Sequence, residues 1–119
     1  KEAAPLHDPR EYDVVVASGE QVTAGLLAMT LQAAGLKARS FMGWQLVQAT
    51  GAHGNARVEA VESAVLDEAL KDGTVCVIPG FQGVSEEGRI ATLGRGGSDT
   101  SAVAIAAGVK ADRCDIYTD

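Results

Sequence analysis

The stretch GRGGSDTSAVAIAAG, residues 94–108, places a glycine-rich turn directly before an apolar run of helical length. Its glycines allow positive φ angles and the close approach of a ligand to backbone N–H groups. We expect Ser98 or Asp99 to cap a helix that continues to Val109, with the free N–H groups of its first turn facing the same place. Arg95 adds a planar guanidinium suited to a carboxylate or a phosphate. The stretch therefore predicts an anion site at the start of a helix, although a plain loop before a capped helix has the same composition.

Strand-like and helical segments alternate on both sides of the C-terminal helix. Short β-branched or continuous apolar runs predict strands, and apolar residues at helical spacing predict helices. The expected elements are a strand at 13–17, a helix from residue 20 to Gly35, a strand at 37–42, a helix at 59–72, a strand at 74–78, the helix at 98–109 and a strand at 114–117. This order predicts an α/β fold, a three-layer αβα sandwich with a mainly parallel sheet.

Two of the expected strands lead into similar turns. VVVASGEQ (residues 14–21) and VCVIPGFQ (residues 75–82) share valine at the first and third positions, glycine at the sixth and glutamine at the eighth. We interpret them as two parallel strands that each end in a glycine turn, rather than as a sequence repeat. Open α/β sheets bind ligands at the carboxyl ends of their strands. Both turns and the GRGGSD stretch are therefore expected to face one crevice.

Length and charge limit the classes of function. The 119 residues are enough for one domain, residues 1–119, and the net charge of -6 gives no large positive field to attract nucleic acid or anionic lipid. The N-terminal KEAAPLHDPREY has no signal-peptide pattern. No continuous apolar run approaches the roughly 18 residues that a membrane span needs. We expect a cytoplasmic protein without a nucleic-acid or membrane partner.

The two cysteines, Cys76 and Cys114, lie in apolar, strand-like runs. Neither has a second cysteine or a histidine at the spacing of metal ligands. Buried, reduced thiols are therefore expected, rather than a disulfide or a zinc site.

Longer motifs carry a specific resemblance. ASGEQVTAGLLAMTLQAAGLKARSFMGWQ (residues 17–45), HGNARV (53–58), GFQGVSEEGRIATLGRGGSD (80–99) and LGRGGSDTSAVAIAAGVKADRCDIYTD (93–119) resemble the corresponding segments of aspartokinases, members of the amino-acid kinase family. The resemblance implies ATP-dependent phosphorylation of the side-chain carboxylate of L-aspartate, which gives 4-phospho-L-aspartate and ADP and opens the pathway to lysine, threonine, methionine and diaminopimelate. Mg²⁺ is expected with ATP because it neutralises the phosphates during transfer.

The same resemblance assigns roles to individual residues. Glu20 of the SGE motif would hold the α-amino group of the substrate, and Arg95 would pair with a substrate carboxylate. Ser98 would contact the substrate, and Asp99 would help to organise the catalytic site. An amino acid needs one acidic and one basic partner, so these residue types fit the task. The residues expected along the nucleotide are those of the YTD motif, Tyr117, Thr118 and Asp119.

Two departures from the family pattern concern the ends of the chain. Aspartokinases begin with a KFGGTS-type loop that supplies a lysine and glycine N–H groups to the phosphates, and no such loop precedes Lys1. They also continue past YTD into a VDGVY-like segment and into ACT domains that bind inhibitory amino acids. We therefore expect a piece of a catalytic domain, without the phosphate-loop segment and the ACT regulatory domains, that binds substrate at most and does not turn over alone.

Other interpretations remain open at this level. Another kinase of the family, acting on acetylglutamate, glutamate, carbamate or UMP, and a non-catalytic binding or assembly module are the alternatives, and a homo-oligomer is expected. Glu20 alone would fit an acidic residue in the first turn of a helix. Trp44 is expected in the core, and Arg57 and Glu59 on a solvated face. His53 has no acidic or cysteine neighbour in the sequence, so a structural or exposed position is expected.

Overall fold

The fold comes from a computed structural model that describes residues 8–94 and 96–118. Four helices and six strands follow one another in these residues. In chain order they are α1 (Pro9–Ala33), β1 (Ala38–Ser40), α2 (Gly43–Leu46), β2 (Val47–Thr50), β3 (Arg57–Val61), α3 (Ala64–Lys71), β4 (Val75–Val77), β5 (Gln82–Val84), β6 (Ile90–Thr92) and α4 (Gly97–Gly108).

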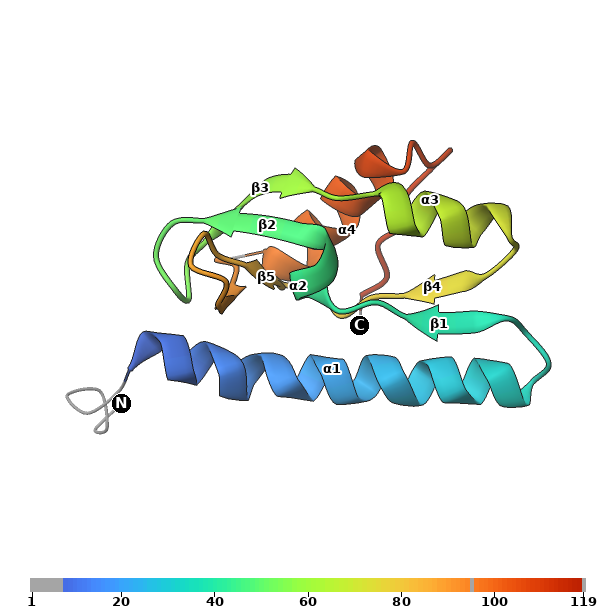
Figure 1. Cartoon of the computed structure of the whole chain (residues 1–119), viewed down its shortest axis with the longest axis horizontal. Coiled ribbons are helices and arrows are strands. Elements are labelled where there is room, and N and C mark those ends of the chain that lie inside the picture. The colour runs from blue at the N-terminus through green and yellow to red at the C-terminus, as the bar shows by residue number, and fades with distance from the viewer. Residues whose placement is uncertain (1–7, 95, 119) are drawn as a thin grey trace.

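The elements form helix, strand and helix layers (Figure 1). Helix α1 packs on β1, β4 and β6, whereas α3 packs on β4, and α4 packs on β3 and β5. Strands β1 and β4 pair in parallel, and the second sheet has the order β3-β2-β5-β6. Its central β2–β5 pairing is parallel, and the β2–β3 and β5–β6 pairings are antiparallel. The expected α/β class is confirmed, and the expected strands at 37–42 and 74–78 are the parallel pair β1 and β4.

The expected strand at 13–17 is wrong, because these residues belong to α1. The helix starts at Asp8, whose Oδ1 accepts a hydrogen bond from the backbone N–H of Arg10 at 2.9 Å, and Pro9 occupies the first turn, where its missing N–H costs nothing. This hydrogen bond and the Arg10 side chain hold the pKa of the Asp8 carboxyl below its ordinary value. The cap and the packing of α1 on the sheet outweigh the β-propensity of the valine run. The expected turn at Ser18-Gly19 therefore lies inside the helix.

Helix α1 also corrects the expectation about membrane-spanning segments. On length and composition alone, its 25 residues are long and apolar enough to cross a membrane. It contains no uninterrupted apolar run of that length, because glycines, threonines and glutamines are interspersed along it. One such helix near the N-terminus is weak evidence for a membrane span, because core helices and signal sequences meet the same criterion. Here the helix carries a buried carboxylate, Asp13, on the face that packs on the sheet.

Three other predicted elements differ from the structure. The expected helix at 59–72 is shorter, because residues 57–61 form β3 and pair with β2, with Val61 opposite Val47. The expected strand at 114–117 does not form, and residues 113–118 are neither helix nor strand. Helix α4 begins at Gly97, after Gly96 at a φ of 73°, which is two or three residues earlier than a Ser98 or Asp99 cap would place it. A glycine can adopt this left-handed conformation at little cost, so it can end the turn and start the helix.

Two apolar clusters form the core. The larger one contains Phe41, Leu46, Val47, Leu66 and Ala69, and the smaller one contains Ala49, Ala56, Ala91 and Leu93. Trp44 is 46% exposed and lies outside both, which corrects its expected core position. Arg57 and Glu59 are exposed, as expected.

Both cysteines are free, as expected, but their burial differs from the prediction. Cys76 is half-buried in β4, and Cys114 is exposed because its expected strand does not form. Burial raises the pKa of the Cys76 thiol. A raised pKa lowers the thiolate fraction at a given pH, and the thiolate is the reactive form.

We therefore expect an aromatic disulfide reagent at pH 8 to modify Cys114 before Cys76. The measurement is the time course of reagent release for the parent chain and for Cys76→Ser and Cys114→Ser. The Cys76→Ser chain should keep the fast phase, and the Cys114→Ser chain should keep only a slow phase that accelerates as the pH rises. A fast phase that survives in Cys114→Ser would contradict the burial of Cys76.

Candidate functional site

Gln82 joins helix α1 to the turn before β5. Its side chain is 1% exposed, and its Nε2 donates to the backbone oxygens of Ala17 and Gly80, both at 3.3 Å. Its Oε1 accepts from Gln21 Nε2 at 3.1 Å. The two glutamines of the repeated pattern therefore meet, although one lies in a helix and not after a strand. Glu20 lies beside Gln21, so these hydrogen bonds fix the segment of α1 that carries it.

The start of α4 rests on the Gly80-Phe81 turn. Phe81 has a φ of 55°, its N–H donates to Ser101 Oγ at 3.0 Å, and its carbonyl accepts from the N–H of Leu93 at 2.8 Å. A side chain on Gly80 would lie 3.4 Å from Ser98 Cα. A non-glycine residue in the left-handed region costs of order 1–3 kcal/mol and occurs at positions that the surroundings hold in place. Gln82 and the turn thus connect the Glu20 segment of α1 with the Ser98 end of α4.

The glycines of the GRGGSD stretch serve two different purposes. Among the described glycines of the stretch, only Gly96 has a positive φ. Gly94 lies against the side chain of Asn55, and a side chain on Gly97 would lie 2.9 Å from Phe81 Cβ. These two positions therefore require glycine for close packing of backbone against neighbours.

The structure places some of the predicted site residues and not others. Glu20, Ser98 and Asp99 are all exposed, and Asp99 lies in the first turn of α4, where the helix dipole favours a negative charge. Arg95 and Asp119 lie outside the described residues. Tyr117 is 89% exposed, and no hydrogen bond or ion pair joins Tyr117 or Thr118 to the rest of the described chain. Among the described residues, the fold thus connects the segments that carry Glu20 and Ser98, whereas Tyr117 and Thr118 make no such contact.

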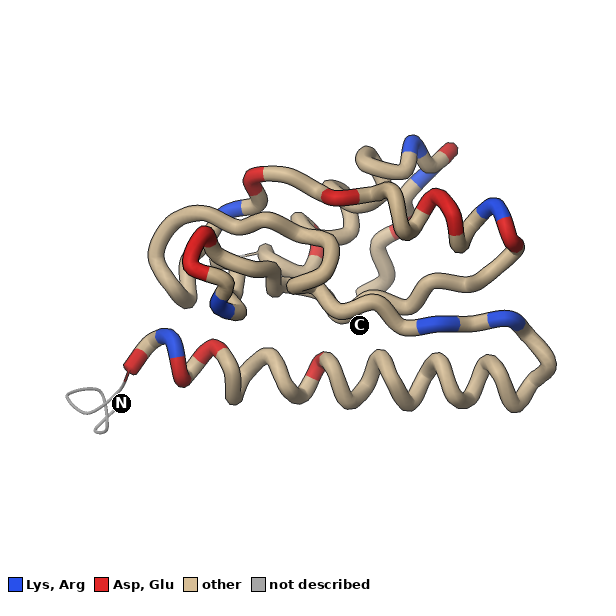
Figure 2. Tube along the Cα trace, in the orientation of Figure 1, with Lys and Arg blue, Asp and Glu red and all other residues tan. Residues whose placement is uncertain are grey.

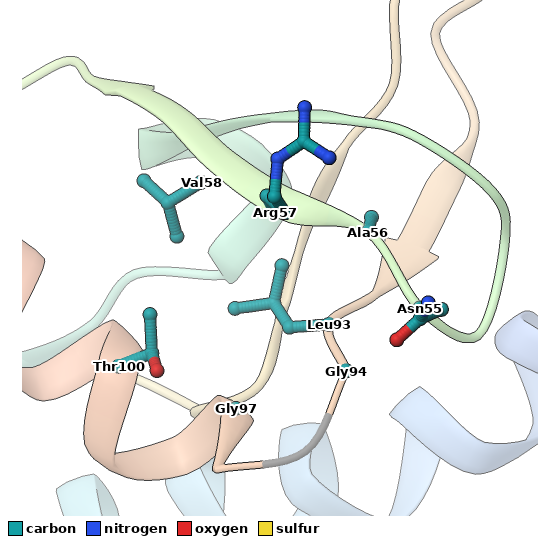
Figure 3. Close-up of a pocket in the computed structure, with 8 residues that line it drawn as sticks. All are labelled: Asn55, Ala56, Arg57, Val58, Leu93, Gly94, Gly97 and Thr100. Carbon is teal, nitrogen blue, oxygen red and sulfur yellow. The ribbon is translucent and has the colours of Figure 1, made fainter.

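A cavity of about 430 Å³ opens beside the glycine-rich stretch. Figure 3 shows Gly94, Gly97 and Thr100 along one side of it, and the segment from Asn55 to Val58 along the other. Backbone groups, the Asn55 amide, the Thr100 hydroxyl and the apolar Leu93 line it, whereas the Arg57 guanidinium points away from Gly97 and Thr100 in Figure 3. Among the described residues, neutral donors line the cavity, and such donors suit a small polar ligand.

A buried carboxylate that was not predicted from the sequence lies next to this region. Asp13 is 1% exposed, and its Oδ2 accepts from the N–H groups of Thr92 at 3.0 Å and Gly54 at 3.2 Å, while its Oδ1 accepts from Thr92 Oγ1 at 2.8 Å. His53 Nδ1 lies 2.9 Å from the same Oδ2, so the expectation that His53 has no acidic partner is wrong. The signal available in the sequence was an aspartate directly before three valines. An aspartate is buried beside apolar residues only when its oxygens accept hydrogen bonds. Asp13 thereby holds the loop before β3 and the end of β6 together.

Comparison with known proteins agrees with this architecture. The family model described as "Amino acid kinase family" matches residues 2–119. The chain belongs to the amino acid kinase family. The model match covers the Gln82 contacts, the glycine-rich stretch and the segment after α4, so the amino acid kinase fold accounts for the whole described structure.

Several relatives are aspartokinases. The chain is 52% identical to aspartokinase 2 of Bacillus subtilis (strain 168) over 111 residues, and 54% identical to the aspartokinase of Rickettsia bellii over 110 residues. Each match covers 92% of this chain and 27% of the relative, so the chain spans about a quarter of these proteins.

The fold is also similar to solved aspartokinase structures. The E. coli aspartokinase III structure in complex with aspartate and ADP (R-state) superposes with a TM-score of 0.87 at 34% identity, over 99% of this chain and 28% of that one. The aspartate kinase from Synechocystis gives a TM-score of 0.73 at 44% identity, over 97% of this chain and 19% of that one.

Proposed function

We propose that the chain forms the acceptor-binding part of an aspartate kinase, which transfers the terminal phosphoryl group of ATP to the side-chain carboxylate of L-aspartate. The products would be 4-phospho-L-aspartate and ADP, and the step would lead to lysine, threonine, methionine and diaminopimelate. The observation that carries the proposal is the Gln82 connection, which ties the Glu20 segment of α1 to the Gly80 turn, on which the Ser98 end of α4 rests. The named relatives and the aspartate complex of a similar protein support aspartate as the acceptor.

The proposed roles follow from charge. Glu20 would accept hydrogen bonds from the substrate ammonium, and Arg95 would form a bidentate pair with a substrate carboxylate. Ser98, at the exposed start of α4, would donate to the substrate, and Asp99 would orient groups around it. Holding both ends of the amino acid fixes the position of the side-chain carboxylate, which is the nucleophile in phosphoryl transfer.

ATP is the proposed phosphoryl donor, supported by the ADP complex of the similar E. coli enzyme. Tyr117, Thr118 and Asp119 are the proposed nucleotide contacts. The described residues contain no group of three or more His, Cys, Asp or Glu side chains that could hold a metal ion, so Mg²⁺ stays a prediction from the family resemblance. Because phosphoryl transfer depends on positioning and charge neutralisation, we expect this chain alone to bind acceptor without turnover.

Two further expectations accompany this proposal. A biosynthetic kinase of this type would work in the cytoplasm, and it would act as a homo-oligomer.

Calorimetric titration of the folded chain with L-aspartate tests the acceptor site. We expect Arg95→Ala and Glu20→Gln each to weaken binding by about 10- to 100-fold, because each removes a charge-assisted contact of roughly 1.5–3 kcal/mol. Arg113→Ala and Glu68→Gln are matched controls, since both parent residues are exposed and lie outside α1 and α4.

The competing acceptors belong in the same experiment. L-Glutamate, N-acetyl-L-glutamate, carbamate and UMP should bind at least about 10-fold more weakly than L-aspartate if the acceptor site is specific. Preferential binding of one of them would replace aspartate by another acceptor of the same family. Absence of binding to a chain with the expected circular dichroism spectrum would contradict an acceptor site within these residues.

A further inference from the structure

The amide of Gln82 is buried, and its nitrogen and its oxygen are both hydrogen-bonded. Nε2 donates to the backbone oxygens of Ala17 and Gly80, and Oε1 accepts from Gln21 Nε2. A glutamine offers two donor hydrogens on one nitrogen and an acceptor oxygen, so these contacts match its chemistry. An ionised glutamate would place a charged oxygen against two carbonyl oxygens, and a methionine would form none of the three hydrogen bonds. The position therefore favours an amide over other side chains of its size.

Apolar packing alone does not fix the position of the middle of α1. The buried residues in this part of the helix are small, namely Ala17, Ala24 and Ala28. Burial of apolar surface is non-directional, so small side chains allow a helix to rotate or shift at little cost. Hydrogen bonds, in contrast, depend steeply on distance and angle. Within the described chain, every hydrogen bond that joins residues 14–29 of α1 to another element involves Gln82.

Glu20 has no polar contact that would hold its side chain. Its carboxylate forms no hydrogen bond or ion pair with the residues that the structure describes. It is also the last charged residue of α1, and the helix beyond it is tan in Figure 2. The position of the carboxylate is therefore set by the backbone of α1. Gln82 holds that backbone through Gln21, the next residue along the helix, and through the carbonyl of Ala17 in the preceding turn.

The turn on the other side of Gln82 has supports of its own. The N–H of Phe81 donates to Ser101 Oγ at 3.0 Å, and the carbonyl of Phe81 accepts from the N–H of Leu93 at 2.8 Å. Neither hydrogen bond involves the Gln82 side chain. Loss of the Gln82 amide would therefore release the helix more than the turn, and its effect should reach Glu20 rather than Ser98.

We infer that Gln82 is a positioning residue for the ammonium group of the acceptor. Its side chain is 1% exposed, so it does not contact the acceptor and acts through Glu20. Charge-assisted hydrogen bonds between nitrogen and a carboxylate are short, at about 2.7–2.9 Å, so a small displacement of the helix is enough to lose one. The inference rests on the proposed function, because it requires Glu20 to bind the acceptor ammonium.

Calorimetric titration of the folded chain with L-aspartate and with succinate tests the inference. Succinate has the two carboxylates of L-aspartate without the α-amino group, so its binding does not use the Glu20 contact. We expect Gln82→Met to raise the dissociation constant of L-aspartate by about 10-fold and that of succinate by less than about twofold. Glu20→Gln should likewise weaken L-aspartate more than succinate. In a chain that already carries Glu20→Gln, the further change Gln82→Met should weaken L-aspartate binding by less than about twofold, because both changes act on one contact.

Two controls separate positioning from a general loss of stability. Gln32→Met is the matched control, because Gln32 Nε2 donates to the backbone oxygen of Ala38 at 2.8 Å and ties the end of the same helix to the start of β1. Leu66→Ala opens a cavity in the larger apolar cluster, on α3. Both variants should leave the two dissociation constants within about twofold of the parent values. Circular dichroism shows which variants are folded under the conditions of the titration.

Unchanged binding of L-aspartate by Gln82→Met would overturn the inference and leave the proposed function intact. Equal weakening of L-aspartate and succinate, or equal weakening by Gln82→Met and Gln32→Met, would indicate a structural role only and would also overturn it. A loss of the same size in the Glu20→Gln chain as in the parent would do the same, and this comparison decides alone if succinate does not bind the parent chain. A folded parent chain that binds no L-aspartate would contradict the proposed function itself.

Discussion

Replacing Asp13 by alanine is expected to lower the free energy of unfolding by about 3–5 kcal/mol. The carboxylate is 1% exposed and accepts hydrogen bonds from Thr92 N–H, Thr92 Oγ1 and Gly54 N–H. Without it, these donors lose their acceptor, and those of Thr92 are themselves buried. A domain has a total stability of about 5–15 kcal/mol, so the loss would be a large part of it. Urea unfolding followed by circular dichroism measures the change.

A graded series separates the contribution of the hydrogen bonds from the general cost of replacing an aspartate. Thr92→Val removes only the hydroxyl donor to Asp13 Oδ1 at 2.8 Å and should cost about 1 kcal/mol. Asp112→Ala changes an exposed aspartate and should stay within about 0.5 kcal/mol of the parent chain. The double variant of Asp13 and Thr92 should lose less than the sum of the single losses, since the two side chains share one contact. A parent-like midpoint for Asp13→Ala would show that the buried carboxylate contributes nothing to stability.

Leu46→Ala is expected to lower the free energy of unfolding by about 2–5 kcal/mol. Leu46 is 0% exposed and lies at the end of α2, in the larger apolar cluster with Phe41 and Leu66. The loss combines the transfer of the missing methyl and methylene groups with the cavity that remains. The neighbouring backbone is held closely, because a side chain on Gly83 would lie 2.6 Å from the Val47 carbonyl oxygen, so the space can close only in part.

The same substitution at an exposed leucine provides the control. Leu70 lies on α3 and is 46% exposed, so Leu70→Ala should cost less than about 1 kcal/mol. Thermal and urea midpoints of the two variants, measured at one protein concentration, compare them directly. Equal losses for the two variants would mean that the cluster around Leu46 is not the core of the chain.

Local patterns predicted several elements correctly. The apolar runs at 37–42 and 74–78 form the parallel strands β1 and β4, and the run after the glycine-rich stretch forms α4. The signal for the start of α1 was also present, since Asp8 before Pro9 is a standard helix start. The valine run that follows predicts a strand instead, because β-branched residues favour strands when their neighbours are not known. Tertiary packing of the alanines and Asp13 decides the conformation in favour of the helix.

The candidate site could also be predicted only in part from the sequence. The motifs with Glu20, Ser98 and Asp99 were found in the sequence, and so was the pairing of similar patterns around Gln21 and Gln82. That the two glutamines touch depends on a contact between residues 61 positions apart, and no periodicity predicts it. The Asp13 network likewise joins residues 79 positions apart. Such contacts arise only when α1 lies across the strands, because their donors and acceptors are far apart along the chain.

Local apolar periodicity and contiguous motifs are enough to predict the α/β class and the family, and they suggest the candidate substrate residues. Tertiary packing is needed to show that residues 13–17 are helical, that Asp13 is a buried hydrogen-bond acceptor and that the large apolar residues of α1 face outward. The physical reason is burial. Which side of a helix is covered depends on where distant segments pack, and α1 has apolar residues on more than one side.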